Sequence, residues 1–335
     1  MKNIFILGSG GWGTALAVMC DGCGHKVTLW SKFPEEIERI KQAGENAVLL
    51  PKIKISETIG LTSSLEDLEK SDLIIIAVPS FAVRDTAKLI REQIGELPKT
   101  VAIVTKGLEK GSLKRMSQVV EEEIPGAAVV VVSGPSHAEE VARGLPTTVV
   151  AASKDKQAAF FVQDVLMNNT LRIYTRSDMV GVELCAALKN VIALAAGICD
   201  GLGLGDNTKA ALITRGLAEI ARLGEAMGAN NSTFNGLAGI GDLIVTCTSM
   251  HSRNRRYGIL IGKGNTTQEA QQKVGMTVEG YHAAAAAYEL ARRMGVEMPI
   301  VERCYKVLYQ EEPAFVSVSQ LMERPRKHES ESEWE

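Results

Sequence analysis

The clearest chemical signal is a glycine-rich motif near the start of the chain, Gly8-Ser9-Gly10-Gly11-Trp12-Gly13. It has the spacing G-x-G-x-x-G, follows an apolar run directly and opens an apolar helix pattern, the context in which this motif binds dinucleotides. There Gly8 permits a tight turn, Gly10 lets the backbone approach a pyrophosphate, and Gly13 lets helix and strand pack closely. The helix N-terminus adds unpaired N–H groups and partial positive charge. The motif predicts a dinucleotide site; a glycine-rich turn without a ligand is the weaker interpretation.

The end of the second predicted strand indicates which dinucleotide binds. An NAD-selective site places Asp or Glu there to accept hydrogen bonds from the ribose hydroxyls. This chain reads Leu29-Trp30-Ser31-Lys32, with no carboxylate before Glu35. Ser31 and Lys32 could hold a 2′-phosphate by hydrogen bond and charge, although Lys32 is also explained as a solvated surface lysine. We therefore expect NADPH to be preferred, with NADH also accepted.

Two loops in the first half carry candidate groups for hydride transfer. That chemistry needs an acid or base for the alcohol proton and donors for the substrate oxygen. Lys106 follows the apolar run Val101–Val104, and Ser133-Gly134-Pro135-Ser136-His137-Ala138 follows Val129–Val132. Ligands of parallel sheets bind outside the carboxyl ends of the strands, so both loops are predicted to face the cofactor.

Lys189 is a candidate in the second half, within the otherwise apolar stretch Val182–Ala196. A lysine there faces either solvent or an internal cleft, and the periodicity does not choose between them. Burial would favour the neutral amine and let Lys189 act as a base near neutral pH.

An acid and a basic cluster follow Lys189 in the chain. Asp242 lies among glycines at a predicted helix start, where an N-cap is the simpler interpretation. Ser252-Arg253-Asn254-Arg255-Arg256 suits a phosphate monoester, and a solvated basic surface explains it equally well. The histidines His137, His251 and His282 lack metal-ligand spacing, so we expect no metal site and place them as structural or peripheral, with His137 able to face the cleft.

The order of elements predicts how these residues are positioned. Several strand candidates are apolar along their whole length, which indicates a parallel sheet covered by helices on both faces. The predicted strands are Asn3–Leu7, Val27–Trp30, Leu73–Val78, Val101–Val104, Val129–Val132 and Thr148–Ala152. Helix patterns such as Glu35–Gln42, Phe81–Gln93 and Leu113–Glu122 lie between them. The alternation predicts a doubly wound α/β domain over residues 1–176.

Beyond about Thr175 the strand signals end, and long Ala- and Leu-rich stretches predict a mainly helical domain over residues 177–322. The predicted helices are Val182–Ile198, Thr208–Met227, Thr277–Met294 and Ile300–Gln310. A second glycine cluster, Gly201–Asp206, follows a helix and is predicted to be a helix–helix loop. The charged segment 323–335 is expected to be a disordered tail.

Composition narrows the function classes. The 335 residues carry a net charge of −3, which gives no indication of nucleic-acid binding. The longest apolar runs fall short of the roughly 20 residues that a membrane span needs, and the N-terminus lacks the pattern of a signal peptide. Of the scattered cysteines only Cys20 and Cys23 have a redox-like spacing, at the wrong end of a helix. We expect a cytoplasmic protein with reduced thiols.

In this order, the motifs resemble the NAD(P)-dependent glycerol-3-phosphate dehydrogenases, especially the bacterial form. The resemblance covers nearly the whole chain, and the ordered set is specific where any single part would be weak. Its parts are Gly8–Ala15, Thr105–Leu108, Gly134–Val141, Glu183–Asn190, Asn207–Ala210, Gly239–Thr246 and Ser252–Asn254. The resemblance implies an N-terminal Rossmann domain, a helical C-terminal domain and a substrate cleft between them. It also implies reversible reduction of dihydroxyacetone phosphate to sn-glycerol 3-phosphate for phospholipid synthesis, and a homodimer is expected.

The resemblance also implies residue roles. Lys189 looks like the catalytic acid/base, Lys106 would lie near substrate and nicotinamide, and Asp242 would help set the proton state of the lysine. The implied substrate contacts are Lys106, Gly134, Ser136, Lys189, Asp242, Ser252, Arg253 and Asn254. The implied cofactor contacts are Gly8, Gly10, Gly11, Trp12, Gly13, Ser31, Lys32, Lys106, Ala138, Arg253 and Glu279.

Two residues depart from the family pattern, and two other functions stay open. Gly11 stands where the family commonly has Ser, and Lys32 where Arg or His is more usual, which weakens the expectation of NADPH. A β-hydroxy-acid or ketopantoate-type reductase would use the same architecture. A non-catalytic dinucleotide sensor would need the glycine-rich loop but not Lys106, Lys189 and Asp242 together.

Overall fold

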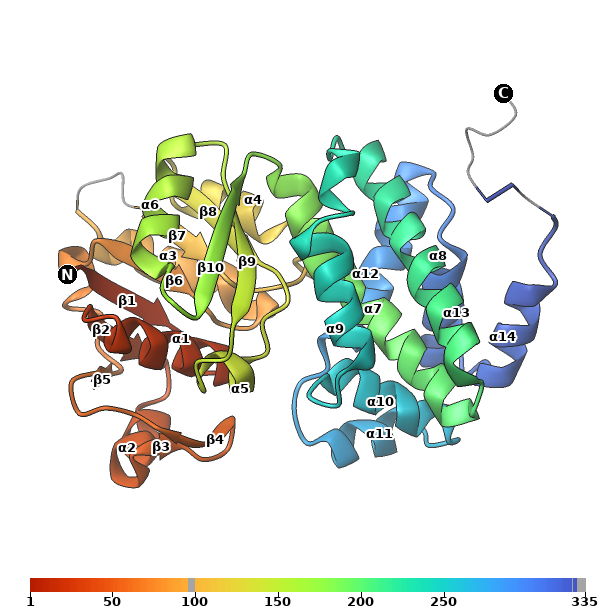
Figure 1. Cartoon of the computed structure of the whole chain (residues 1–335), viewed down its shortest axis with the longest axis horizontal. Helices are drawn as coiled ribbons and strands as arrows, with labels where there is room; N and C mark the ends of the chain where they lie inside the picture. Colours follow the sequence, from red (N-terminus) through yellow and green to blue (C-terminus); the bar gives the residue numbers. More distant parts are fainter. Residues whose placement is uncertain (96–99, 327, 330–335) are drawn as a thin grey trace.

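The chain forms two halves that lie side by side, with the strands in the N-terminal half and a helical C-terminal half (Figure 1). The computed structural model describes residues 1–95, 100–326 and 328–329. The main sheet has eight strands, in the spatial order β10 (Leu171–Arg176), β9 (Thr147–Ala152), β8 (Ala128–Ser133), β7 (Thr100–Ile103), β6 (Leu73–Ile76), β1 (Asn3–Leu7), β2 (Lys26–Trp30) and β5 (Gly60–Thr62). A separate hairpin pairs β3 (Glu45–Asn46) with β4 (Leu50–Lys54).

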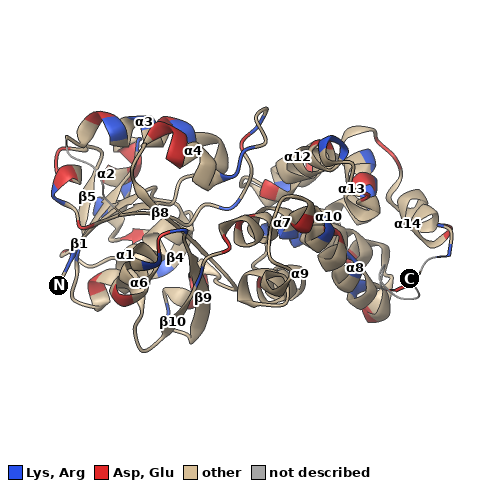
Figure 2. Ribbon diagram, turned by 90° about the horizontal axis from the view of Figure 1, so that it is seen from above, with Lys and Arg blue, Asp and Glu red and all other residues tan. Residues whose placement is uncertain are grey.

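Helices cover the sheet on both faces, as the apolar strands predict. The helices of this half are α1 (Gly11–Gly22), α2 (Pro34–Ala43), α3 (Val83–Gln93), α4 (Met116–Glu123), α5 (Ala138–Val141) and α6 (Lys156–Leu166). Ile4 and Ile6 pack with residues of α1 and α6, whereas Phe5 and Leu7 pack with α3 and α4. Charged residues are frequent along α3 and α4 (Figure 2). The doubly wound α/β fold is confirmed.

One strand pair differs from the parallel sheet that the sequence predicts. β8 and β9 run antiparallel, with Val132 opposite Ala151, while β9 and β10 are parallel again. A parallel crossover needs a dozen or more residues, usually with a helix long enough to return along the sheet. Here α5 has only four residues, so the chain turns back instead.

The C-terminal half is built around one long buried helix, α7 (Met179–Leu202). The other helices are α8 (Gly205–Ala226), α9 (Asp242–Thr248), α10 (Arg253–Gly262), α11 (Thr267–Val274), α12 (Glu279–Met294), α13 (Pro299–Tyr309) and α14 (Ala314–Met322). By length and hydropathy α7 is apolar enough to cross a membrane, but its most apolar window lies wholly inside the protein. Its apolar composition is therefore that of a core helix.

Glycines let α7 and α10 approach until their backbones touch. A Cβ at Gly197 would lie 2.1 Å from the carbonyl oxygen of Arg255, and one at Gly258 would lie 2.0 Å from that of Leu194. Gly201 likewise faces the backbone of α10, so part of the second glycine cluster serves helix packing. The loop predicted there is shorter than expected, because α7 continues to Leu202 and α8 begins at Gly205.

A buried polar cluster joins α4 to α7. Glu183 accepts hydrogen bonds from the backbone N–H of Ser117 at 2.7 Å and from its hydroxyl at 2.6 Å, and it also pairs with Arg115. All three residues are buried. This cluster fixes the first turns of α7 against the N-terminal half.

Several boundaries differ from the sequence-based prediction. The helix expected from Leu113 begins at Met116, because Leu113 has a positive φ of 61° and Arg115 is the N-cap. The short strands β3 to β5 and the edge strand β10 were not predicted. β10 ends at Arg176 and α7 begins at Met179.

The charged segment after α14 is described only in part. Arg324 pairs with Glu297 at 3.3 Å, and the Glu329 carbonyl accepts a hydrogen bond from Arg215 at 3.2 Å. Residues 327 and 330–335, on which the expectation of a disordered tail also falls, lie outside the described residues.

Candidate active site

The glycine-rich motif forms the turn between β1 and α1. Gly8 has φ of +121°, and a Cβ there would lie 2.7 Å from the Ala77 backbone. A Cβ at Gly13 would lie 2.0 Å from the carbonyl oxygen of Gly8. Around Gly10, by contrast, no atom of the described residues lies within 4 Å of an added Cβ. Gly8 and Gly13 are therefore required by close packing, and Gly10 leaves the open space that a pyrophosphate needs.

Trp12 and Gly11 line the other side of this turn. Trp12 is half-buried and packs on a small cluster of Ala15, Leu50 and Ile53, on which Ala138 at the start of α5 also packs. A Cβ at Gly11 would lie 2.7 Å from the Leu49 carbonyl oxygen. The β3–β4 turn therefore closes over Gly11, which gives a physical reason for glycine where the family commonly has serine.

Ser31 and Lys32 lie at the end of β2 but differ in their surroundings. Ser31 is buried, and its hydroxyl donates to Glu36 Oε2 at 2.7 Å. The hydroxyl of Ser9, within the glycine turn, donates to the same oxygen at 2.8 Å. Lys32 is exposed. Of the two residues expected to hold a 2′-phosphate, only Lys32 presents a group that is not already bonded to a carboxylate.

The reacting groups meet at Asp242. Lys106, in the loop after β7, donates to Asp242 Oδ2 at 2.8 Å, and Lys189 from the middle of α7 donates to Oδ1. Lys189 also donates to the Thr246 hydroxyl at 2.9 Å. Asp242 is the first residue of α9, with Gly241 as the N-cap. The N-cap interpretation of Asp242 is therefore wrong, since its carboxylate points inward and is 1% exposed.

Burial and charge set the proton affinities of these groups. Burial lowers the pKa of Lys189 below its ordinary value, Asp242 opposes that shift, and the charge of Lys106 reinforces it. Burial would raise the pKa of Asp242, but Lys106 and Lys189 outweigh it and hold that pKa below its usual range. Asp242 stays ionised, and Lys189 can lose its proton far more easily than a lysine in water. The periodicity of the sequence left open whether Lys189 faces solvent or the interior, and in the structure it faces the interior.

The loop after β8 closes this cluster. The carbonyl oxygen of Gly134 accepts from Lys106 Nζ at 3.2 Å and from the Ser136 hydroxyl at 2.9 Å. Gly134 has φ of +153°, and a Cβ there would lie 2.9 Å from Val149. The structure therefore brings Lys106, Gly134 and Ser136 together with Lys189 and Asp242.

The cluster Ser252-Arg253-Asn254 divides into structural and exposed groups. Ser252 is the N-cap of α10 and accepts from the Arg255 N–H at 3.2 Å. The Asn254 amide is buried between Asn190, to which it donates at 2.9 Å, and the Gly280 N–H, from which it accepts at 2.8 Å. Arg253 is exposed, and its guanidinium donates to the Thr277 carbonyl at 3.1 Å. Within this cluster Arg253 is the group with an accessible charge.

Glu279 lies near Arg253 and the loop of Lys106. It accepts from the Ser80 hydroxyl at 3.2 Å, and a Cβ added to Gly107 would lie 3.9 Å from its carboxylate. Burial raises the pKa of Glu279, while Ser80 and the Arg253 charge act in the opposite direction. Arg253 and Glu279 therefore border the same side of the site as Lys106.

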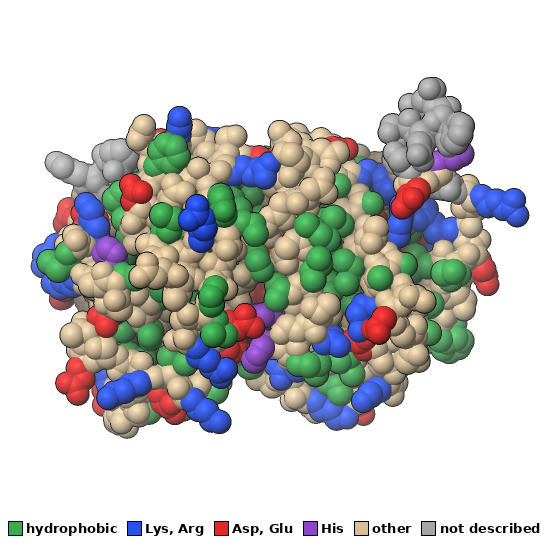
Figure 3. Space-filling model, viewed as in Figure 1, with side chains coloured by type: hydrophobic (Ala, Val, Ile, Leu, Met, Phe, Trp, Pro, Cys, Tyr) green, Lys and Arg blue, Asp and Glu red, His purple; other side chains and the backbone are tan. Residues whose placement is uncertain are grey.

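Two histidines set aside by the sequence analysis meet between the halves. The rings of His137 and His251 are 5.7 Å apart, and Glu139 lies 3.8 Å from His251. Histidine and acidic side chains lie together at the seam between the halves (Figure 3). Nε2 of His137 is buried and has no hydrogen-bond partner among the described residues. Burial lowers the pKa of His137, and the nearby Lys189 charge adds to the lowering.

Sequence reasoning missed three residues that organise the site: Glu36, Thr246 and Asn190. Glu36 lies five residues beyond Ser31, in the first turn of α2, and it is found only when the turn into α2 brings its carboxylate back to the Ser31 hydroxyl. Thr246 follows Asp242 by one helical turn, which is a spacing that could have indicated a shared face. The partnership of Asn190 with Asn254 spans two helices and leaves no local signal.

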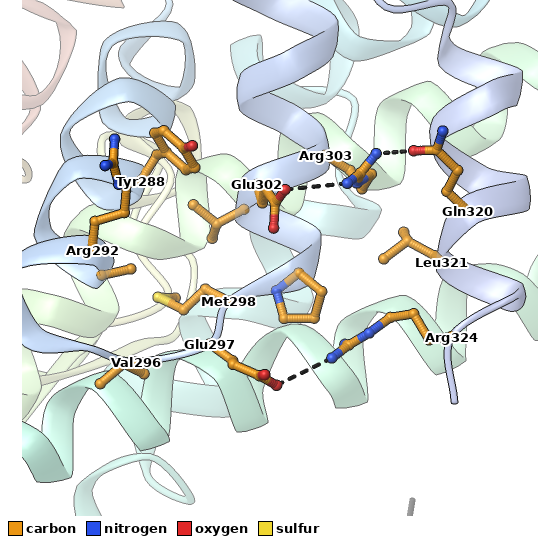
Figure 4. Close-up of a pocket in the computed structure, with 13 residues that line it drawn as sticks. Tyr288, Arg292, Val296, Glu297, Met298, Glu302, Arg303, Gln320, Leu321 and Arg324 are labelled. Atoms are coloured by element: carbon orange, nitrogen blue, oxygen red, sulfur yellow. Dashed lines mark hydrogen bonds and ion pairs between the residues drawn. The ribbon is translucent and has the colours of Figure 1, made fainter. Parts of the chain in front are cut away.

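A cavity of about 240 Å³ lies elsewhere in the C-terminal half, between α12, α13 and α14 (Figure 4). Its charged side chains pair with one another, as Glu297 does with Arg324 at 3.3 Å and Glu302 with Arg303 at 3.2 Å. No residue assigned above to cofactor or substrate lines it. Among the described residues no group of three or more His, Cys, Asp or Glu gathers as a metal site would require.

Comparison with known proteins gives matches over both halves. Residues 3–159 match the family described as the NAD-dependent glycerol-3-phosphate dehydrogenase N-terminus, and residues 178–318 match the corresponding C-terminus. A glycerol-3-phosphate dehydrogenase (NAD(P)+) of Moorella thermoacetica is 54% identical over 334 residues, covering 99% of this chain and 98% of its own. One from Desulfitobacterium hafniense is 51% identical, covering 99% of this chain and 94% of its own. The crystal structure of a glycerol-3-phosphate dehydrogenase from Coxiella burnetii superposes with a TM-score of 0.93 at 40% identity, over 96% of this chain and 99% of the other.

Proposed function

The chain belongs to the NAD-dependent glycerol-3-phosphate dehydrogenase family, and on this premise we propose that it reversibly reduces dihydroxyacetone phosphate to sn-glycerol 3-phosphate. The observation that carries the proposal is the meeting of Lys106 and Lys189 on Asp242. This arrangement supplies a buried proton donor beside the loops at the carboxyl ends of the strands, where ligands of such sheets bind. A dinucleotide sensor without activity would not need it.

The residues of the first half fit a nicotinamide dinucleotide. The open space at Gly10 and the N-terminus of α1 suit its pyrophosphate. Trp12, Ala138, Lys106, Arg253 and Glu279 are the further proposed contacts. When bound, the reduced cofactor supplies the hydride that goes to the carbonyl carbon of the substrate. The cofactor is NADH or NADPH, and Lys32 is the group that would bind a 2′-phosphate.

Lys189 is the proposed acid/base. In reduction, its ammonium form stabilises the negative charge that grows on the carbonyl oxygen and then donates the proton to it. In oxidation, the neutral amine takes the proton of the alcohol. Asp242 keeps Lys189 oriented and opposes the loss of its proton, and Lys106 and Ser136 hold the Gly134 loop beside it.

Arg253 is the proposed anchor of the substrate phosphate. Its exposed guanidinium can bind phosphate through paired N–H groups, which fixes the carbon presented to the cofactor. Ser252 and Asn254 act on the substrate chiefly by holding the start of α10 in place, through the N-cap and the contacts to α7 and α12. This phosphate-directed site is what separates the proposal from a β-hydroxy-acid or ketopantoate reductase.

The cellular role follows from the proposed reaction. Its product is the backbone of glycerophospholipids, so we propose a place in phospholipid synthesis in the cytoplasm. The six cysteines are unpaired, which supports a reducing compartment. A homodimer is proposed as well, with the exposed Phe315 and Met322 of α14 as apolar side chains to examine at an interface.

Absorbance of the reduced nicotinamide tests the proposal. We expect rapid loss with dihydroxyacetone phosphate, and little with unphosphorylated dihydroxyacetone, ketopantoate or β-keto acids. Lys189→Ala is expected to abolish turnover while direct binding of the dinucleotide persists, and Lys263→Ala on the surface serves as the control. Near-normal kcat in Lys189→Ala would contradict its role. Cofactor binding without turnover of triose phosphate by the wild type would contradict the proposed reaction.

A further inference from the structure

The carboxylate of Glu36 lies beside the end of β2, where the sequence of the strand itself has no Asp or Glu. The hydroxyls of Ser9 and Ser31 both donate to Oε2 of Glu36, at 2.8 Å and 2.7 Å. Ser9 lies within the glycine-rich turn and Ser31 is the first residue after β2, and both are buried. Glu36 is half-buried in the first turn of α2. The glycine-rich turn and the end of β2 are therefore both hydrogen-bonded to one carboxylate, which α2 supplies.

This location has a defined use in dinucleotide-binding sheets. An acid at the end of the second strand accepts hydrogen bonds from the ribose hydroxyls of NAD, and an NADP site replaces it with a cation for the 2′-phosphate. Here α2 supplies the acid five residues later in the chain, so a search along the strand alone does not find it. Within residues 1–95, 100–326 and 328–329, no hydrogen bond reaches the second oxygen of Glu36, Oε1. That oxygen is available to accept hydrogen bonds from a ligand.

We propose that Glu36 is a specificity-determining residue that binds the adenosine ribose hydroxyls and opposes a 2′-phosphate, so that this chain uses NADH in preference to NADPH. The inference rests on the proposed function and deepens it. It reverses the preference expected from Ser31 and Lys32. The Ser31 hydroxyl, which was expected to hold the phosphate, donates a hydrogen bond to the carboxylate instead.

Lys32 would favour a 2′-phosphate, whereas Glu36 opposes it, and the structure indicates that Glu36 has the larger effect. Lys32 is exposed on a flexible side chain, so its charge is screened by water and salt. Glu36 is held by two buried hydroxyls, and its negative charge is fixed at one point. A phosphate brought near it meets like charge in a partly desolvated place, where repulsion is stronger than at the surface. Lys32 is expected to reduce this penalty without removing it.

The test compares kcat/KM for NADH and NADPH in wild type, Glu36→Gln and Glu35→Gln. Glu36→Gln removes the charge and keeps an oxygen that can accept from a serine. We expect the wild type to favour NADH, and Glu36→Gln to shift the NADPH/NADH ratio towards NADPH by about tenfold, the factor equivalent to about 1.4 kcal/mol. Glu35→Gln removes an exposed carboxylate from the same helix turn and is expected to leave the ratio unchanged. Circular dichroism establishes that each variant is folded.

Direct titration with NADH and NADPH, in the absence of any triose phosphate, separates this inference from the proposed function. A wild type that binds NADH more tightly, with the discrimination lost in Glu36→Gln, supports the inference even if dihydroxyacetone phosphate is not reduced. A wild type that favours NADPH overturns it. An unchanged ratio in Glu36→Gln, or an equal shift in Glu35→Gln, also overturns it, because the local carboxylate would then have no effect of its own.

Discussion

Lys106 and Asp242 form an ion pair of 2.8 Å that joins the strand-bearing half of the molecule to the helical half. Lys106 follows β7, whereas Asp242 begins α9, and the side chain of Asp242 is almost fully enclosed. The same carboxylate also receives Lys189. Asp242 thus fixes the position of two lysines that come from the two halves of the molecule, and this relationship underlies the first two predictions.

Asp242→Asn is expected to lower kcat for reduction by about 100-fold, within the range typical of acid–base catalysis. Without the carboxylate, burial and the Lys106 charge lower the pKa of Lys189 further, so less of the ammonium form remains at neutral pH. The falling limb of the pH–kcat profile for reduction should move to lower pH. The exposed Asp164→Asn is the control. If the falling limb of the profile does not shift, Asp242 does not influence the proton state of Lys189.

The two directions of the reaction should depend oppositely on pH. Reduction needs the ammonium form of Lys189 and is lost as pH rises through its pKa, whereas oxidation needs the neutral amine and gains over the same range. Because burial lowers this pKa, both changes should occur well below the pKa of an ordinary lysine. Steady-state rates in each direction from pH 6 to 10 measure this. Rate changes that occur only near the pKa of a free lysine would contradict this prediction.

Arg253→Ala is expected to raise KM for dihydroxyacetone phosphate by about 10- to 100-fold, the loss of a charged hydrogen-bond partner. At saturating dinucleotide, which compensates for any cofactor contact that Arg253 makes, the weak turnover of unphosphorylated dihydroxyacetone should barely change, since this substrate has no phosphate to lose. Arg292→Ala, on α12 at the separate cavity, is the matched control. Equal losses for both substrates would show that Arg253 supports the fold instead of binding phosphate.

Glu219→Gln tests a buried carboxylate outside the active site. Glu219 accepts from the N–H groups of Ile300 at 2.7 Å and Val301 at 3.2 Å, at the start of α13. Burial raises its pKa from 4.5 to about 7, although the two N–H groups oppose the shift. The folded state therefore holds a proton that the unfolded state has lost between these values, and the contribution of Glu219 to stability falls as pH rises through them.

Relative to Glu219→Gln, the wild type should lose up to about 3 kcal/mol of unfolding free energy between pH 4.5 and 8. Urea denaturation of both proteins across this range measures the difference. Parallel curves for the two proteins would mean that Glu219 titrates normally in the folded state.

Gly258→Ala is expected to destabilise the protein by about 1–3 kcal/mol or more, because the new methyl group would press against the Leu194 carbonyl and force α10 away from α7. Gly22→Ala is the matched control, since nothing in the part of the chain that the structure describes lies within 4 Å of its added Cβ. Denaturant midpoints of the two variants give the comparison. Equal midpoints would show that α7 and α10 separate at little cost.

Much of this architecture could be predicted from the sequence, because its signals are local. The apolar runs of β1, β6, β7 and β8 are continuous, and Gly8 to Gly13 are recognised by their spacing together with the strand before them and the helix after them. The antiparallel turn at β9 could not be found in that way, because it depends on the length of α5 relative to the sheet. The two-residue strand β3 and the three-residue strand β5 are too short to show any period.

The site was predictable in its residue types and less so in their contacts. Lys106, Lys189 and Asp242 could be singled out as charges in apolar or glycine-rich surroundings, but the sequence could not show that one carboxylate receives both lysines. The contact of Ser31 was hard to predict for a related reason. Its hydroxyl fits a phosphate as well as a carboxylate, and only the turn into α2 brings Glu36 to it.

The contact of Glu183 with Ser117 and Arg115 bears on how substrate enters. These buried bonds tie the first turns of α7 to α4, while Lys189 lies farther along the same helix. Exchanging several buried hydrogen bonds for water at each turnover would be costly, so this contact should act as a pivot. Any opening of the seam for entry and release would then leave this contact in place and separate His137 from His251, whose rings face each other across the seam at 5.7 Å.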